Sequence, residues 1–597
     1  MTTDQKTTAT DLQRLNENIS RVEALSQRLV AAMATKKQID PGLHAPSHEV
    51  YFKAASAYMN TMVQNPAKVM EHQVSYWGKM LKHYVDAQHV LTSGKLAAPQ
   101  DPTPKDRRFS NPMWDTHPYF NYVKQNYLLT SQAIGEALDD LDGLEKDDRK
   151  RVQYFTQQII DMFAPNNFLA TNPDALERAV ETNGQSLVDG LENLVKDIEE
   201  NSGELVVTLA DKSAFTVGEN LAMTPGSVVY RNRMFELIQY TPTTETVDQV
   251  PLVVFPPWIN KFYVLDMKEQ NSFIKWVVDQ GITLFVVSWV NPDTSYAGVG
   301  MDEYLDEGYV EAITQVKAIT GQPQVNAVGY CIGGTTLSLA AAVLDKRGDK
   351  SLKSVTLFTT LTDFSDQGEM SVFLDNDFVD GIEREAVETG MLSSFIMART
   401  FSYLRSNDLI YGPAIKSYMM GQAPPAFDLL YWNGDSTNLP GKMAVEYLRG
   451  LCQQNRFATT GFSIGGESVT LKDVKVPVCA IACETDHIAA WKASYAGLRQ
   501  FGSRSKTFLL SQSGHVAGIV NPPSKKKYGH YTKTGMTVEA DAWFDGATLN
   551  EGSWWPRWRE WLSKRAGKQV PARDPGSDTH PVLAAAPGTY VLNQRST

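Results

Sequence analysis

The chain is poor in cysteine: its 597 residues include only four, Cys331, Cys452, Cys479 and Cys483. So few cysteines exclude a disulfide scaffold and are typical of a reducing compartment. Cys479 and Cys483 lie four positions apart in an apolar run, with no neighbours that complete a metal site. We therefore expect both to be buried small residues rather than metal ligands.

Positive charge and long apolar runs are also scarce. Lys and Arg number 56 against 68 Asp and Glu, a formal net charge of −12. Because nucleic-acid-binding proteins normally carry a basic stripe, we expect no nucleic-acid partner. The longest apolar candidate, 337–344, is far shorter than the roughly 18 residues of a membrane span, and residues 1–6 are polar. The sequence predicts a cytoplasmic protein without a transmembrane segment.

The first 215 residues have helical periodicity. Apolar side chains recur three and four positions apart from residue 51 onward. Helices are predicted at about 48–91, 117–141, 147–162 and 174–200. Residues 1–215 are therefore interpreted as an all-helical N-terminal domain.

From residue 216 the pattern changes to strands that alternate with helices. Apolar strand signals occur at 228–230, 235–240, 252–255, 282–288, 324–328, 355–359, 476–482 and 506–510. This alternation predicts an α/β domain over 216–597, with a mostly parallel sheet and helices on both faces. The stretch 363–468 is far longer than an ordinary connection between strands. We expect it to form a helical cap over a site.

One motif lies between a predicted strand and a predicted helix. Gly329-Tyr330-Cys331-Ile332-Gly333 follows strand 324–328 and precedes the helical run 335–344. This arrangement is typical of the G-x-S-x-G nucleophile elbow of α/β-hydrolases, with Cys in place of Ser. An acyl group on sulfur is a thioester, which stays reactive toward an alcohol. The cysteine therefore favours acyl transfer over hydrolysis.

A second segment, Gly461-Phe462-Ser463-Ile464-Gly465, also matches G-x-S-x-G. No apolar strand precedes it, no helix follows it, and only 22 residues separate Ser463 from Asp486. Because the motif is meaningful only between a strand and a helix, we interpret this segment as a turn.

The candidate base and acid follow from chain order, which in this fold is nucleophile, acid, base. Four histidines follow Cys331, and only His515 lies directly after the last predicted strand. His530 and His580 lie in polar segments and are expected to be solvated, and His487 adjoins the candidate acid. Asp486 and Glu484 both fit the acid, and Asp486 is preferred because it lies further past its strand.

Two backbone N–H groups are candidates for an oxyanion hole. The N–H of Ile332 follows the nucleophile, and a second should come from the loop 256–261, where we choose Ile259. Near the C-terminus, Trp554, Trp558 and Trp561 have helical spacing. We expect this stripe to be core, the alternative being a polymer- or lipid-facing surface.

With these residues in place, the chain closely resembles the class I poly(3-hydroxyalkanoate) synthases, members of the α/β-hydrolase superfamily that form the polyester of bacterial storage granules. The matching stretches span about 105 to 560. They are Phe109-Ser110-Asn111-Pro112-Met113-Trp114, Pro256-Pro257-Trp258-Ile259-Asn260-Lys261, Ser288-Trp289-Val290-Asn291-Pro292, Gly329-Tyr330-Cys331-Ile332-Gly333-Gly334, Leu404-Arg405-Ser406-Asn407-Asp408-Leu409, Asp428-Leu429-Leu430-Tyr431-Trp432-Asn433-Gly434-Asp435, Asp486-His487-Ile488, Ser513-Gly514-His515-Val516-Ala517-Gly518 and Gly552-Ser553-Trp554-Trp555-Pro556.

The resemblance implies an acyltransferase that polymerises (R)-3-hydroxyacyl-CoA, such as 3-hydroxybutyryl-CoA, with release of CoA and a Cys-bound thioester intermediate. The family's catalytic Cys, Asp and His correspond to Cys331, Asp486 and His515. Whether Asp486 or His515 activates the substrate hydroxyl stays open. Arg405 corresponds to an arginine near the CoA phosphates, with an ion pair inside the cap as the equal alternative. No cofactor or metal is expected, because the CoA thioester is itself the substrate.

The resemblance also implies partners. The N-terminal domain should assist homodimerisation and attachment to the granule surface, where the growing polyester chain and granule-associated proteins lie. Two other functions are alternatives: a cysteine hydrolase of esters or lactones on the same fold, and a non-catalytic granule-binding protein. The large cap and the helical domain argue against the first, and the complete set Cys331, Asp486 and His515 argues against the second.

Overall fold

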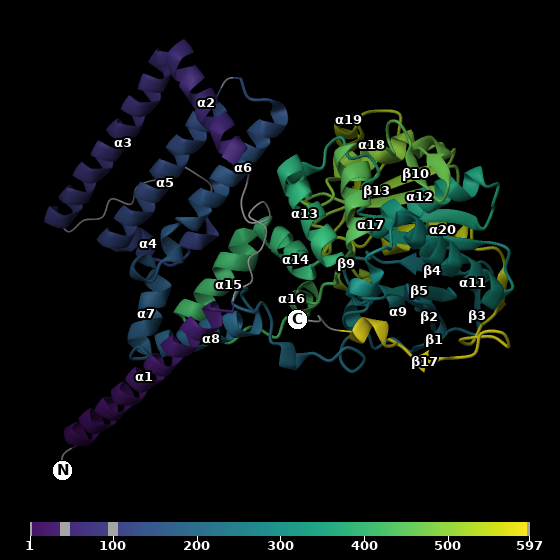
Figure 1. Ribbon diagram of the computed structural model, residues 1–597, viewed down its shortest axis with the longest axis horizontal. Helices are drawn as coiled ribbons and strands as arrows, with labels where there is room; N and C mark the ends of the chain where they lie inside the picture. The colour runs from purple at the N-terminus through teal and green to yellow at the C-terminus, as the bar shows by residue number, and fades with distance from the viewer. Residues whose placement is uncertain (1–2, 36–47, 94–105, 142, 594–597) are drawn as a thin grey trace. The chain divides into compact units, whose positions relative to one another are not determined.

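The computed structural model describes residues 3–35, 48–93, 106–141 and 143–593 (Figure 1). The chain forms two compact units. One contains 1–211 together with 405–425, and the other contains 212–404 together with 426–597. No helix within the described ranges is both long enough and apolar enough to cross a membrane.

The first unit is helical. Its principal helices are α1 (Thr3–Met33), α2 (His48–Gln64), α3 (Pro66–Ser93), α5 (Pro118–Asp139), α6 (Lys146–Met162), α7 (Pro173–Glu181) and α8 (Gln185–Glu200). Two predicted helices are each divided in the structure. Pro66 begins α3 because proline suits the first helical turn but not a helix interior. Gly184 separates α7 from α8 with a left-handed φ of 79°.

Part of the long insertion packs with this helical unit. In residues 405–425, the Tyr418 hydroxyl donates to Asp197 of α8 at 2.6 Å, and Asn193 of α8 donates to the Ser417 carbonyl at 3.1 Å. Gly190 permits the close approach, since a Cβ there would lie 2.0 Å from the Tyr418 carbonyl oxygen. The sequence had placed all of 363–468 in the α/β domain. The structure divides it because α8 supplies the buried partners of this short segment.

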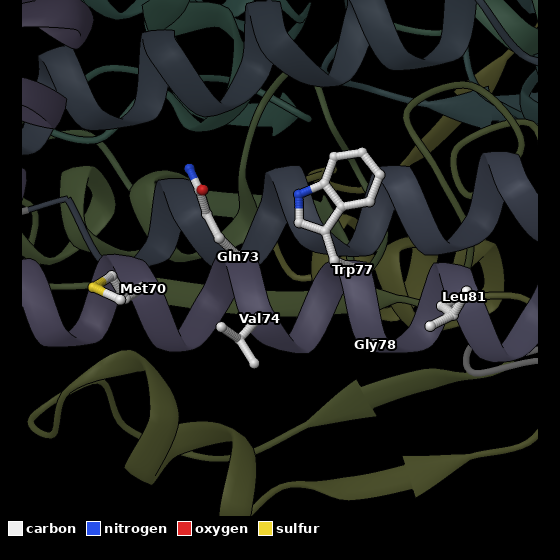
Figure 2. A pocket seen from close by; sticks show the side chains of 6 residues that line it. All are labelled: Met70, Gln73, Val74, Trp77, Gly78 and Leu81. Atoms are coloured by element: carbon white, nitrogen blue, oxygen red, sulfur yellow. The ribbon is translucent and has the colours of Figure 1, made fainter.

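Helix α3 has one apolar face that the described residues leave exposed (Figure 2). Met70, Val74, Trp77 and Leu81 are between 64% and 68% exposed, and they line one pocket with Gln73 and Gly78. Another part of α3 packs on α5, where His83 stacks on Tyr122. A large apolar stripe on a helix normally marks an interaction surface.

The second unit is built on an eleven-stranded sheet with the order β15-β14-β13-β12-β7-β6-β4-β5-β2-β1-β17. Six adjacent strands, from β13 to β5, run parallel. They are β4 (Leu252–Phe255), β5 (Leu284–Trp289), β6 (Val325–Tyr330), β7 (Leu352–Phe358), β12 (Val478–Cys483) and β13 (Lys506–Ser511). The flanking antiparallel strands are β1 (Gly226–Arg231), β2 (Phe235–Tyr240), β14 (His530–Thr532), β15 (Thr548–Asn550) and β17 (Ala584–Ala585).

Helices cover both faces of this sheet, as the alternation in the sequence predicts. They include α9 (Phe273–Asp279), α11 (Glu311–Thr320), α12 (Ile332–Lys346), α18 (Trp491–Gln500) and α20 (Trp555–Ser563). Trp554 and Trp558 are fully buried against Phe273 and Phe358, and Trp561 is partly buried. The prediction that the tryptophan stripe is core is confirmed.

The rest of the insertion belongs to the second unit. It contains α13 (Asn376–Thr389), β8 (Met391–Leu392), α14 (Ser394–Tyr403), α16 (Asp428–Gly434), β9 (Leu439–Pro440) and α17 (Gly441–Glu446). Gly390, whose φ of 76° ends α13, separates this helix from β8. A π-helical stretch, Tyr447–Gln453, continues α17.

Candidate active site

Cys331 stands at a sharp strained turn between β6 and α12. Its φ of 53° and ψ of −125° lie in a region that non-glycine residues rarely adopt. The turn is held from one side by a 2.8 Å hydrogen bond from the Cys331 N–H to the Phe358 carbonyl at the end of β7. Strand, strained residue and helix together form the nucleophile elbow that the motif predicts.

The glycines around Cys331 are required by close packing. A Cβ on Gly329 would lie 2.4 Å from the Gly334 Cα, and a Cβ on Gly333 would lie 2.6 Å from the Phe255 carbonyl oxygen. Real Cβ atoms do not approach other heavy atoms so closely. The small residues therefore let the strand and the helix pass each other at the elbow.

The second motif match has a different structure. Ser463 lies in β10 (Phe462–Ile464), which pairs with β11 (Glu467–Val469), and the turn between them is Gly465–Gly466. Both glycines have positive φ, as a two-residue hairpin requires. No helix opens at Ser463. The rejection of this segment as an elbow is confirmed, although its serine lies in a strand beside the turn.

Asp486 and His515 are brought together by neighbouring parallel strands. β12 and β13 pair with Cys483 opposite Ser511, so the loops that follow them lie at the same edge of the sheet. The Nδ1 atom of His515 lies 2.7 Å from Asp486 Oδ2. The other Asp486 oxygen accepts the N–H groups of Ile488 and Ala489 at 2.8 and 2.9 Å. The Asp486 carboxylate is thus fully buried and oriented toward the imidazole.

The surroundings of His515 favour its charged form. Burial lowers the pKa of His515, but the nearby charge of Asp486, the Cys331 thiol and hydrogen bonds to both raise it, with a net value well above the usual range. Tyr330, the residue before the nucleophile, stacks on the His515 ring with centroids 5.7 Å apart. Its hydroxyl donates to the His515 carbonyl at 3.2 Å. The sequence does not indicate this support, because an aromatic residue within the elbow also suits the core.

The remaining predicted site residues differ in how they are placed. Ile332 is the first residue of α12, so the helix itself provides no acceptor for its N–H. Ile259 is buried in the loop after β4, where its carbonyl accepts from the Thr437 N–H at 3.3 Å. Arg405 begins the insertion segment that belongs to the helical unit. Its assignment to the CoA phosphates stays a prediction.

Two histidines that were expected to be solvated are not. His530 is buried in β14, its Nδ1 lies 3.0 Å from the Gly552 carbonyl oxygen, and burial lowers its pKa. His580 is partly buried, with Nε2 2.6 Å from Gln315. The polar residues around His530 in the sequence give no indication that it lies in a strand of the sheet. Cys479 and Cys483 are fully buried, and burial raises the pKa of both thiols, as expected of inert core cysteines.

Fold and site together define a protein of the α/β-hydrolase class with cysteine as the central residue of the elbow. The family model of the alpha/beta hydrolase fold matches residues 256–522, and the model described as the N-terminus of poly-beta-hydroxybutyrate polymerase (PhaC) matches 105–277.

Comparison with curated relatives identifies the family within this class. The chain is 40% identical to a poly(3-hydroxyalkanoate) polymerase of Methylorubrum extorquens, over 89% of this chain and 88% of that one. It is 40% identical to the polymerase subunit PhaC of Cupriavidus necator, over 88% of each, and 38% identical to that of Rhizobium etli, over 91% and 86%. The chain therefore belongs to the poly(3-hydroxyalkanoate) polymerase family, and it is an enzyme of the acyltransferase type.

Proposed function

We propose that the chain polymerises (R)-3-hydroxyacyl-CoA into a poly(3-hydroxyalkanoate) and releases CoA at each addition, with the acyl chain held on Cys331. The observation that carries this proposal is the 2.7 Å hydrogen bond between His515 and Asp486, beside a cysteine at a strained elbow. A thiol with an adjacent base, which is itself oriented by a third group, is the arrangement of nucleophilic catalysis.

In the acylation step, His515 accepts the thiol proton and the Cys331 sulfur attacks the carbonyl carbon of the CoA thioester. The carbonyl becomes an oxyanion, which the N–H groups of Ile332 and Ile259 stabilise. When the carbon–sulfur bond to CoA breaks, the CoA thiolate takes the proton from His515. The acyl group then remains on Cys331 as a thioester, with no net change of charge.

In the elongation step, the 3-hydroxyl of another acyl unit attacks a thioester carbonyl. An ester bond forms, the thioester bond breaks, and the hydroxyl proton passes to Asp486 or His515 and then to the departing sulfur. Asp486 is already engaged by His515 and two backbone N–H groups, which favours an orienting role over direct proton transfer. We assign Arg405 to the CoA phosphates, since guanidinium suits phosphate. The reaction requires no cofactor or metal.

One experiment separates this function from its alternatives. The purified chain is incubated with (R)-3-hydroxybutyryl-CoA while CoA release and product size are measured. We expect CoA release together with high-molecular-mass polyester. A cysteine hydrolase would release CoA and yield only the monomeric hydroxy acid, and a granule-binding scaffold would release no CoA.

We further propose that the helical unit attaches the enzyme to the surface of storage granules in the cytoplasm and assists homodimerisation there. The exposed face of α3, formed by Met70, Val74, Trp77 and Leu81, supports this proposal, because a polyester surface is largely apolar (Figure 2).

The variant Val74→Asp tests the attachment, with Val180→Asp as the matched control. Both valines are exposed on helices of the helical unit, Val74 by 68% and Val180 by 78%. Only Val74→Asp should reduce sedimentation of the protein with isolated granules, and both variants should retain CoA release. Equal sedimentation of the two variants would contradict the assignment of α3 to granule attachment. Analytical ultracentrifugation of the same proteins measures whether they form the proposed dimer.

A further inference from the structure

A short segment of the insertion is hydrogen-bonded to the loop that follows β4. Three backbone carbonyls of this loop accept hydrogen bonds from Trp432 and Thr437. The Trp258 carbonyl accepts from Thr437 Oγ1 at 3.0 Å, the Ile259 carbonyl from the Thr437 N–H at 3.3 Å, and the Lys261 carbonyl from Trp432 Nε1 at 2.8 Å. Asn260 and Ser436 form an isolated antiparallel bridge between the two segments.

A buried ion pair adds to these contacts between the insertion and the loop. Lys261 Nζ lies 2.7 Å from Asp435 Oδ1, with side-chain exposures of 4% and 17%. The Tyr263 hydroxyl donates to the other Asp435 oxygen at 2.8 Å. A buried lysine is tolerated only while its partner stays in place. The loop and the insertion segment therefore form one rigid unit.

The opposite side of the loop is fixed to the elbow. Trp258 Nε1 donates to Thr336 Oγ1 of α12 at 3.2 Å, and Trp289 Nε1 donates to the Pro256 carbonyl at 2.9 Å. The ring of Tyr447, also from the insertion, lies edge-on to Trp258 with centroids 5.3 Å apart. The loop after β4 is thus held between the helix that opens at Cys331 and the insertion.

Peptide geometry gives the bond from Thr437 a specific consequence. The carbonyl of Trp258 and the N–H of Ile259 belong to the same planar, trans peptide unit, in which the two groups point in opposite directions. A hydrogen bond that fixes the carbonyl therefore fixes the direction of the N–H. The Thr437 hydroxyl, buried at 2% exposure of its residue, sets the orientation of the Ile259 N–H without touching any reacting atom.

We propose that Thr437 is a positioning residue for the oxyanion hole, acting through the peptide unit that joins Trp258 to Ile259. This inference rests on the proposed function of Ile259 as the second oxyanion donor. The insertion then completes the acylation machinery instead of only covering it, because one of the two donors is aligned only while Trp432–Thr437 lies against the loop.

The variant Thr437→Val tests this proposal, because valine keeps the shape of threonine but removes the hydroxyl. Thr224→Val is the matched control: its buried hydroxyl donates to Asp266 in the same unit. We expect Thr437→Val to lower kcat for CoA release by about tenfold or more, with little change in KM. Thr437→Ser, which restores a hydroxyl, should recover most of this loss. Thr224→Val should change the melting temperature but not kcat.

A second measurement separates the oxyanion hole from the nucleophile. Alkylation of Cys331 by iodoacetamide is a substitution at a CH2 carbon that forms no oxyanion, so it reports the thiol and His515 alone. The alkylation rate of Thr437→Val should equal that of the parent chain. The proposal is overturned if alkylation falls in step with kcat, or if Thr437→Val and Thr224→Val have the same kcat. Undiminished CoA release by Cys331→Ala would instead overturn the proposed function itself.

Discussion

Two segments of this chain match the same five-residue motif, and the structure places them in different surroundings. At Gly329–Gly333, a buried strand enters, a helix leaves, and the central residue is strained at a φ of 53°. At Gly461–Gly465, the central serine is the exposed residue of a short hairpin strand, and the positive φ values belong to the glycines. The glycines of the elbow prevent collisions with backbone atoms, whereas those of the hairpin provide positive φ.

The surroundings of the two central residues differ in the same way. Cys331 is next to an imidazole that is stacked on Tyr330 and bonded to a buried carboxylate. Ser463 faces Ser468 across a two-stranded ladder. The proposed nucleophile therefore combines a strained backbone position with a neighbouring base at the same edge of the sheet.

The largest expected difference between the segments is in catalysis. Cys331→Ala should reduce CoA release from (R)-3-hydroxybutyryl-CoA by at least about 10³-fold, because no nucleophile remains to form the thioester. Ser463→Ala should leave the rate unchanged. The measurement is a continuous assay of free CoA. Appreciable turnover by Cys331→Ala, or a comparable loss in Ser463→Ala, would reverse the roles of the two motifs.

The next largest expected difference is in stability, between the glycines of the elbow and those of the hairpin. Gly333→Ala places a Cβ 2.6 Å from the Phe255 carbonyl oxygen, within backbone that cannot yield. We expect it to lower the free energy of unfolding by about 3 kcal/mol. Gly466→Ala meets no atom within 4 Å, and only its φ of 77° is unfavourable, at a cost of about 1 kcal/mol. Urea denaturation of both variants checks the order, and a greater loss for Gly466→Ala would contradict this account of the glycines.

Much of the catalytic core could be predicted because its signals are local. The six parallel strands are continuous apolar runs, and the loops that hold Cys331, Asp486 and His515 follow directly from them. The fold fixes where such loops meet, so the chain order predicted the contact between Asp486 and His515 that the structure shows.

The remaining features depend on contacts that are distant in the sequence. The segment 405–425 packs with α8 because of Gly190 and Tyr418, which no local pattern connects. His530 is buried because a short antiparallel strand extends the sheet after a run of lysines. Thr437 contacts the loop after β4 from 179 residues away. Such contacts produce no periodic pattern in the sequence, so they could not be predicted from it.

The smallest expected effect concerns the pH dependence of stability. It tests the ion pair between His515 and Asp486, which lies beside Cys331 and not beside Ser463. The pKa of His515 is held well above its usual range of about 6.5 by Asp486 and Cys331. A raised folded-state pKa contributes stability that is complete below the unfolded value and is lost as the pH rises through the folded value. Asp486→Asn should therefore lower the free energy of unfolding by about 1 kcal/mol near pH 6, and by less at alkaline pH. Urea denaturation at both pH values measures this difference, with Ser463→Ala as a control that should show no pH-dependent loss. A loss for Asp486→Asn that is equal at both pH values would mean that the carboxylate contributes packing alone and does not hold the proton on His515.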